Sequence, residues 1–95
     1  MKEQAPAFIR YVFVCELERD QTPFCGPPGT HIREKLKLAI KEKGMASKVR
    51  VSRSGCLDVC ASGPNVLIMP DNIWFKEVNE EDVPAIVLRA LEGIS

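Results

Sequence analysis

Hydrophobic residues follow two different spacings along the chain, and these predict an alternation of strands and helices. Residues 8–15 end in an unbroken apolar and aromatic run, and residues 66–69 form a second such run. Runs of this kind are typical of strands buried on both faces. Residues 48–53 alternate strictly between apolar and polar side chains, which predicts a strand with one buried face. Residues 73–75 are expected to return as the second strand of a hairpin after a turn at residues 70–72.

Two other segments show helical spacing. Apolar residues recur every three or four positions between Thr30, which can cap a helix, and Gly44, which can end it. Residues 16–29, which precede this helix, are polar and rich in proline and glycine, so they are expected to form a loop. A second helix is expected from Asn79, with acidic residues in its first turn. Pro84 lacks a backbone donor, so we expect this first turn to be irregular.

The order of these elements predicts an α/β fold. A strand–helix–strand unit is right-handed, and it makes its two strands parallel and adjacent. The two continuous apolar strands belong in the centre of the sheet, and the alternating strand and the last strand belong at its edges. We therefore expect a four-stranded mixed sheet in the order 2-1-3-4, with helices on both faces.

Length and composition indicate one globular domain. The chain has 95 residues, of which 45% are hydrophobic and 27% charged. We expect a single domain over residues 1–95, with residues 1–7 as a flexible tail. Residues 1–50 hold ten Lys and Arg against six Asp and Glu, and residues 51–95 hold three against seven. Neither half has the clustered basic stripe of a protein that binds nucleic acid.

The apolar runs and the cysteines bear on the compartment. No apolar run approaches the about 20 residues that a membrane-spanning helix needs, and the first residues lack the apolar segment of a signal peptide. A cytoplasmic protein is therefore expected, without a membrane as partner. A reducing cytosol argues against disulfides, so the cysteines are expected to bind metal or to act in catalysis. There are four of them: Cys15, Cys25, Cys56 and Cys60.

The predicted topology brings all four cysteines to one edge of the sheet. Cys15 and Cys56 follow the carboxyl ends of two neighbouring parallel strands, and such ends meet at one edge. Cys25 lies in the loop that leaves the first strand, and Cys60 is one helical turn beyond Cys56. Four thiolates suit zinc or an iron–sulfur cluster. Structural zinc usually uses two short cysteine pairs, and Cys15 and Cys25 are too far apart for one, so the spacing favours iron–sulfur.

Several motifs of the chain occur together in one known family. They are VFVC at 12–15, CGP at 25–27, VRVS at 49–52, SGCL at 54–57, GP at 63–64 and IWF at 73–75, with Cys60. Through them the sequence closely resembles the thioredoxin-like [2Fe–2S] ferredoxins, relatives of the small cluster-binding subunit of the NADH:quinone oxidoreductase complex. The resemblance implies a thioredoxin-like fold and a homodimer. It also implies a [2Fe–2S] cluster with these ligands: Cys15, Cys25, Cys56 and Cys60.

The function implied by this resemblance is one-electron transfer to or from a redox protein. No Ser-His-Asp set, phosphate loop or C-x-x-C pair indicates an enzyme. The residues leave open a cluster carrier or sensor, a structural zinc interaction module and a thiol–disulfide enzyme. Trp74 and Phe75 are expected in the core or in a dimer interface, with docking of a partner as the alternative. Asp58, where relatives often have a small residue, is expected to oppose reduction by charge repulsion.

Overall fold

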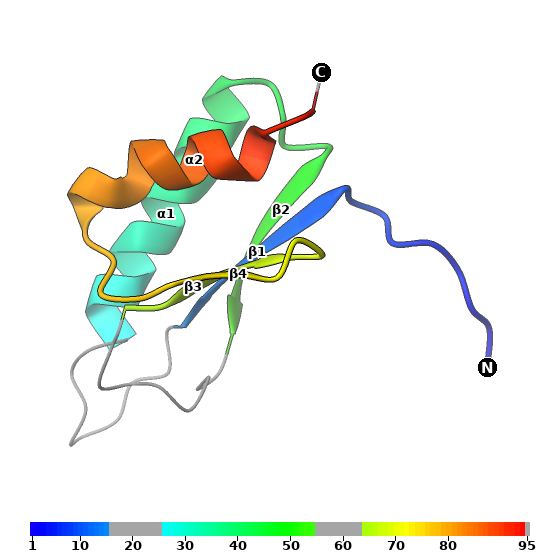
Figure 1. Ribbon diagram of the computed structural model, residues 1–95, viewed down its shortest axis with the longest axis horizontal. Helices are drawn as coiled ribbons and strands as arrows, with labels where there is room; N and C mark the ends of the chain where they lie inside the picture. Colours follow the sequence, from blue (N-terminus) through cyan, green and yellow to red (C-terminus); the bar gives the residue numbers. More distant parts are fainter. Residues whose placement is uncertain (16–25, 55–63, 95) are drawn as a thin grey trace.

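The sheet of the computed structural model has the strand order β2-β1-β3-β4, and the structure describes residues 1–15, 26–54 and 64–94 (Figure 1). β1 (Arg10–Cys15) pairs in parallel with β2 (Val49–Ser54) and antiparallel with β3 (Val66–Met69). β4 (Ile73–Phe75) pairs antiparallel with β3. The predicted strand order is confirmed. The continuous apolar strands β1 and β3 are central, and the alternating strand β2 lies at an edge.

The first helix begins earlier than the sequence pattern predicted. α1 (Gly26–Glu42) starts four residues before Thr30, inside the segment expected to be a loop. Pro27 and Pro28 lie in its first turn, where the backbone N–H has no partner within the helix and the fixed φ of proline suits the helix. The expected stop is confirmed, since Gly44 follows the helix with a φ of 71°, a conformation that glycine adopts without steric cost.

The second helix has the irregular start that Pro84 predicted. A 3₁₀ turn, η2 (Glu80–Asp82), precedes α2 (Val83–Leu91). Asn79 caps this start with its Oδ1, which accepts a hydrogen bond from the N–H of the second residue of the turn at 3.0 Å. The Asn79 N–H in turn donates to Asp82 Oδ2 at 2.9 Å. The Asp82 backbone also donates to the Asn79 side chain, which completes a capping box and satisfies backbone donors that the helix itself leaves without acceptors.

One hydrophobic core lies between the sheet and both helices. The strands supply Val12, Val14, Val49, Val51, Val66 and Ile68, and the helices supply Ile32, Leu36, Ile40, Val83, Ile86, Val87 and Ala90. The register places Val12 beside Val51 and Ile68, so these residues share one face of the sheet. Figure 1 shows α1 and α2 together on one side of the strands. The expectation of helices on both faces is therefore wrong for the described part of the chain.

The connection into α2 explains why both helices share a face. Val78, between β4 and α2, is buried in the same core as α1. Its backbone N–H donates to the Pro64 carbonyl oxygen at 3.0 Å, which holds this segment against the start of β3. The chain therefore enters α2 from the side of the sheet that α1 already covers. A continuous apolar strand shows that both of its faces are apolar, but it does not show which element covers each of them.

The other face of the sheet carries a group of apolar side chains that we call the aromatic face. It consists of Tyr11, Phe13, Leu67, Met69 and Trp74. The rings of Tyr11 and Phe13 are stacked, with centroids 6.2 Å apart. The side chain of Trp74 is 44% exposed, whereas that of Phe75 packs against the core as expected. No helix among the described residues covers this face.

Arg10 fixes one end of β1, which we call the Arg10 end. Its Nε donates to Asp71 Oδ1 at 2.9 Å, in the turn between β3 and β4. Its guanidinium also donates to the carbonyl oxygens of Ala90, at 2.9 Å, and Glu92, at the end of α2. A cation is favourable there because the last carbonyl groups of a helix carry partial negative charge. One side chain therefore ties β1, the hairpin turn and α2 together.

Candidate functional site

Cys15 is the predicted site residue that the structure describes. It ends β1, its side chain is fully buried, and its thiol is not in a disulfide. The Cys15 N–H donates to the Asn65 carbonyl oxygen at 3.1 Å. In the parallel pairing, Cys15 lies beside Ser54, the last residue of β2. Cys15 therefore lies where the carboxyl ends of two parallel strands meet the residue that precedes β3.

The other three predicted ligands, Cys25, Cys56 and Cys60, lie outside the described residues. Described residues flank them in the sequence: Gly26 begins α1 directly after Cys25, and Ser54 ends β2 two residues before Cys56. Figure 1 shows the start of α1 and the carboxyl ends of β1 and β2 at the same end of the molecule. We call this end the cysteine edge and define it by four described residues: Cys15, Gly26, Ser54 and Asn65.

Asn65 connects Cys15 to the surface of the sheet. Its side chain is fully buried, and its Oδ1 accepts a hydrogen bond from the Trp74 indole Nε1 at 3.1 Å. Its backbone carbonyl is the acceptor for the Cys15 N–H. Sequence reasoning did not single out Asn65. The signal that could have found it is an amide directly before an apolar strand, because a buried polar side chain needs hydrogen-bonding partners.

No second metal site is formed by the described residues. Within residues 1–15, 26–54 and 64–94, no three His, Cys, Asp or Glu side chains lie together as metal ligands. His31, the only histidine of the chain, is exposed on α1.

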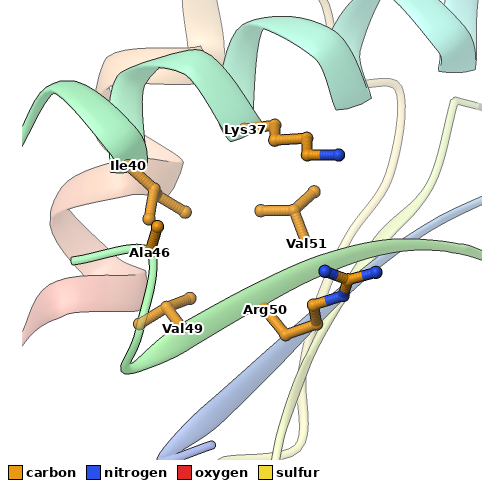
Figure 2. Close-up of a pocket in the computed structure, with 6 residues that line it drawn as sticks. All are labelled: Lys37, Ile40, Ala46, Val49, Arg50 and Val51. Atoms are coloured by element: carbon orange, nitrogen blue, oxygen red, sulfur yellow. The ribbon is translucent and has the colours of Figure 1, made fainter. Parts of the chain in front are cut away.

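The cavity between α1 and β2 lies away from the cysteine edge. Figure 2 shows it beneath Lys37 and Ile40 of α1 and above Val49 and Arg50 of β2. The cavity has a volume of about 60 Å³. Val49 is the β2 partner of Arg10, so the cavity lies toward the Arg10 end of the sheet. A space of this size holds a few water molecules and is too small for a cofactor.

Comparison with known proteins identifies the family. No family model matches the chain. A 2Fe–2S ferredoxin of Clostridium pasteurianum is 30% identical over 87 residues, which cover 87% of this chain and 85% of that protein. A 2Fe–2S ferredoxin of Aquifex aeolicus is 29% identical over 92 residues, which cover 92% and 83%. The crystal structure of the thioredoxin-like [2Fe–2S] ferredoxin from Aquifex aeolicus superposes with a TM-score of 0.76 at 26% identity, over 92% of this chain and 89% of that chain. The chain belongs to the thioredoxin-like [2Fe–2S] ferredoxin family.

Membership of this family establishes the class of function. A ferredoxin is an electron carrier and not an enzyme, and it works with redox partners. The match covers nearly the whole chain, so it includes both the described strands and the segments that hold the other three cysteines. The predicted fold family, strand order, cofactor class and function are confirmed, and the assignment of the individual ligands stays a prediction.

Proposed function

We propose that the four cysteines of this ferredoxin hold its [2Fe–2S] cluster at the cysteine edge. They are Cys15, Cys25, Cys56 and Cys60. The observation that carries the proposal is the position of Cys15, a buried free thiol at the point where β1, β2 and the start of β3 meet. Through a cluster held there, the protein exchanges one electron at a time with a redox protein.

Covalent geometry supports the proposal for the two cysteines next to described residues. Consecutive Cα atoms are about 3.8 Å apart, and two residues of chain span about 7 Å at most. Cys25 is bonded directly to Gly26, and Cys56 is two residues from Ser54. The proposal therefore needs only a short length of chain between each of these cysteines and a residue of the cysteine edge. Cys60 follows Cys56 by four residues, so the length of chain between these two proposed ligands is also short.

The donor chemistry also fits the cluster. Cysteine thiolates are the usual ligands of [2Fe–2S] clusters, which supply the one-electron exchange when bound. The thiolates already make the site negative, and reduction adds a further negative charge to it. The protein controls the free energy of that step through hydrogen bonding, charge and exclusion of water. The full burial of Cys15, and its backbone hydrogen bond to Asn65, are the contributions that the described residues make.

Electron paramagnetic resonance of the anaerobically purified, dithionite-reduced protein tests this assignment. We expect a red-brown protein with the signal of a reduced [2Fe–2S] cluster, and about two iron and two acid-labile sulfide per chain. A colourless protein with stoichiometric zinc would contradict the proposal. Rapid transfer of the intact cluster to an apo-protein would indicate that the chain acts as a cluster carrier.

We further propose that the aromatic face forms the interface of a homodimer. A second copy would remove its half-buried apolar side chains from water, and this burial would stabilise the dimer by about 25 cal/mol per Å² of apolar area. Leu67 lies at the centre of this face, between Phe13 and Trp74 in the strand pairing. Light scattering after size-exclusion chromatography should show a dimer that Leu67→Glu dissociates. The control Leu88→Glu, at an exposed position of α2, should leave the mass unchanged.

The remaining proposals concern the whole chain. We propose that residues 1–95 fold as one domain, which a single cooperative unfolding transition would support. We also propose that the protein works in the cytoplasm, where a reducing environment keeps all four cysteines available as thiolates. Neither helix in the described part of the chain combines the length and apolar character needed to cross a membrane.

A further inference from the structure

A chain of two hydrogen bonds links the surface of the sheet to Cys15. The indole Nε1 of Trp74 donates to Asn65 Oδ1 at 3.1 Å, and the Asn65 carbonyl oxygen accepts from the Cys15 N–H at 3.1 Å. Trp74 is 44% exposed, whereas Asn65 and Cys15 are fully buried. The three residues therefore form a continuous contact from the aromatic face of the sheet to the Cys15 backbone at the cysteine edge.

Strand register explains why tryptophan reaches Asn65. Trp74 lies directly beside Leu67, and Asn65 is two residues before Leu67, so Trp74 and Asn65 are diagonal neighbours. Diagonal neighbours in antiparallel strands are about 7–8 Å apart at Cα, a gap that an aromatic side chain can bridge. Among aromatic residues of this reach, tryptophan also brings an N–H donor. The bond offsets part of the cost of burying the Asn65 amide.

We propose that Asn65 is a positioning residue for the cluster ligand Cys15, and that Trp74 holds Asn65 in place from the surface. The inference rests on the proposed role of Cys15 as a ligand. Asn65 contacts both Trp74 and Cys15, so movement of the indole shifts the backbone that accepts the Cys15 N–H. Outer contacts of this kind orient metal ligands, and their removal commonly lowers metal affinity about 10-fold to 100-fold. The indole on the aromatic face is thereby coupled to the stability and the reduction potential of the cluster.

The test compares cluster-loaded variants that differ in this contact. Trp74→Phe keeps an aromatic ring and removes the N–H donor, and Asn65→Ala removes the acceptor. We expect cluster loss to a chelator to be several-fold faster in Trp74→Phe and about 10-fold faster in Asn65→Ala. Both variants should have altered electron paramagnetic resonance spectra and higher reduction potentials, because water nearer to Cys15 stabilises the more negative reduced cluster. Leu88→Ala, an exposed apolar position on α2, should behave as wild type.

A double variant shows whether Trp74 and Asn65 act together or independently. If Trp74 acts through Asn65, the variant with both substitutions should lose its cluster no faster than Asn65→Ala alone. Additive effects in the double variant would overturn the proposal. So would wild-type potentials and spectra in both single variants. Trp74→Phe keeps the test decisive if Asn65→Ala fails to fold, since Trp74 is partly exposed and its ring is retained.

A further variant distinguishes failure of this inference from failure of the ligand assignment. Cys15→Ser should change the spectrum of the reduced cluster, because oxygen replaces sulfur on iron. An unchanged spectrum in Cys15→Ser would show that the ligand assignment is wrong. A changed spectrum in Cys15→Ser, with Trp74→Phe and Asn65→Ala both like wild type, would leave the ligand in place and exclude the positioning role alone.

Discussion

The two ends of β1 are held by different kinds of contact. At the Arg10 end, one guanidinium binds the hairpin turn through Asp71 and the end of α2 through Ala90 and Glu92. At the cysteine edge, Cys15 is held through its backbone by Asn65 and by the pairing with Ser54. Charged hydrogen bonds therefore join the layers at one end, while backbone bonds at the other leave the thiol side chain available to a metal. We expect the Arg10 end to govern stability and the cysteine edge to govern redox behaviour.

The largest expected effect is at the cysteine edge. Cys15→Ala removes a proposed ligand and offers no replacement donor, so the purified protein should lose most of its iron and its visible absorbance. Metal analysis and absorption spectroscopy measure this. Far-ultraviolet circular dichroism should retain the helical signal, because the core on the opposite face of the sheet is unchanged. Full iron content in Cys15→Ala would contradict the assignment of redox behaviour to the cysteine edge, since the cluster would then not depend on the end of β1.

A large effect on stability is expected at the Arg10 end. Arg10→Ala removes hydrogen bonds from a charged group that is 14% exposed, and we expect a loss of about 2 kcal/mol of unfolding free energy. That corresponds to a melting temperature lower by about 8–16 °C in a domain of this size. Thermal denaturation followed by circular dichroism measures the shift. Arg50→Ala, at an exposed position of β2, is the control and should change stability by less than about 0.5 kcal/mol.

A smaller effect on stability is expected at the start of α2, the helix that runs between the cysteine edge and the Arg10 end. α2 is held near the start of β3 through Val78 and Pro64, and at its other end by Arg10. Asn79→Ala removes the side-chain cap and should lower the unfolding free energy by about 1 kcal/mol. Chemical denaturation should show this loss with an unchanged reduction potential. A changed potential would mean that the start of α2 contributes to the redox properties, and the division between the two ends would need revision.

The smallest effect compares the same charge change at both ends. Asp58, two residues from both Cys56 and Cys60 in the sequence, should oppose reduction through its negative charge, so Asp58→Asn should raise the reduction potential modestly. Asp71→Asn, at the Arg10 end, should leave the potential unchanged and lower the melting temperature slightly. Redox titration at constant ionic strength measures both. An equal shift in the two variants would show that net charge matters more than position.

Local patterns in the sequence were sufficient for the strand order and for the position of Cys15. Alternating and continuous apolar runs distinguished edge strands from central ones, and the right-handed crossover made β1 and β2 parallel. The end of β1 and the end of β2 then had to share an edge. The irregular start of α2 followed from Pro84. The sequence pattern did not predict the early start of α1, because Pro27 and Pro28 are residues typical of loops. Proline is also suited to a first helical turn.

Contacts between residues far apart in the chain were decided only by the tertiary structure. An apolar strand such as β1 predicts that its side chains avoid water, but not that both helices cover the same face. Arg10 reaches Ala90 across 80 positions, and Trp74 reaches Asn65 through strand register. Such contacts depend on the relative placement of whole elements, which no local spacing encodes. The sequence therefore determined the elements, their order and the chemistry of the cysteines, whereas packing determined which side chains support that chemistry.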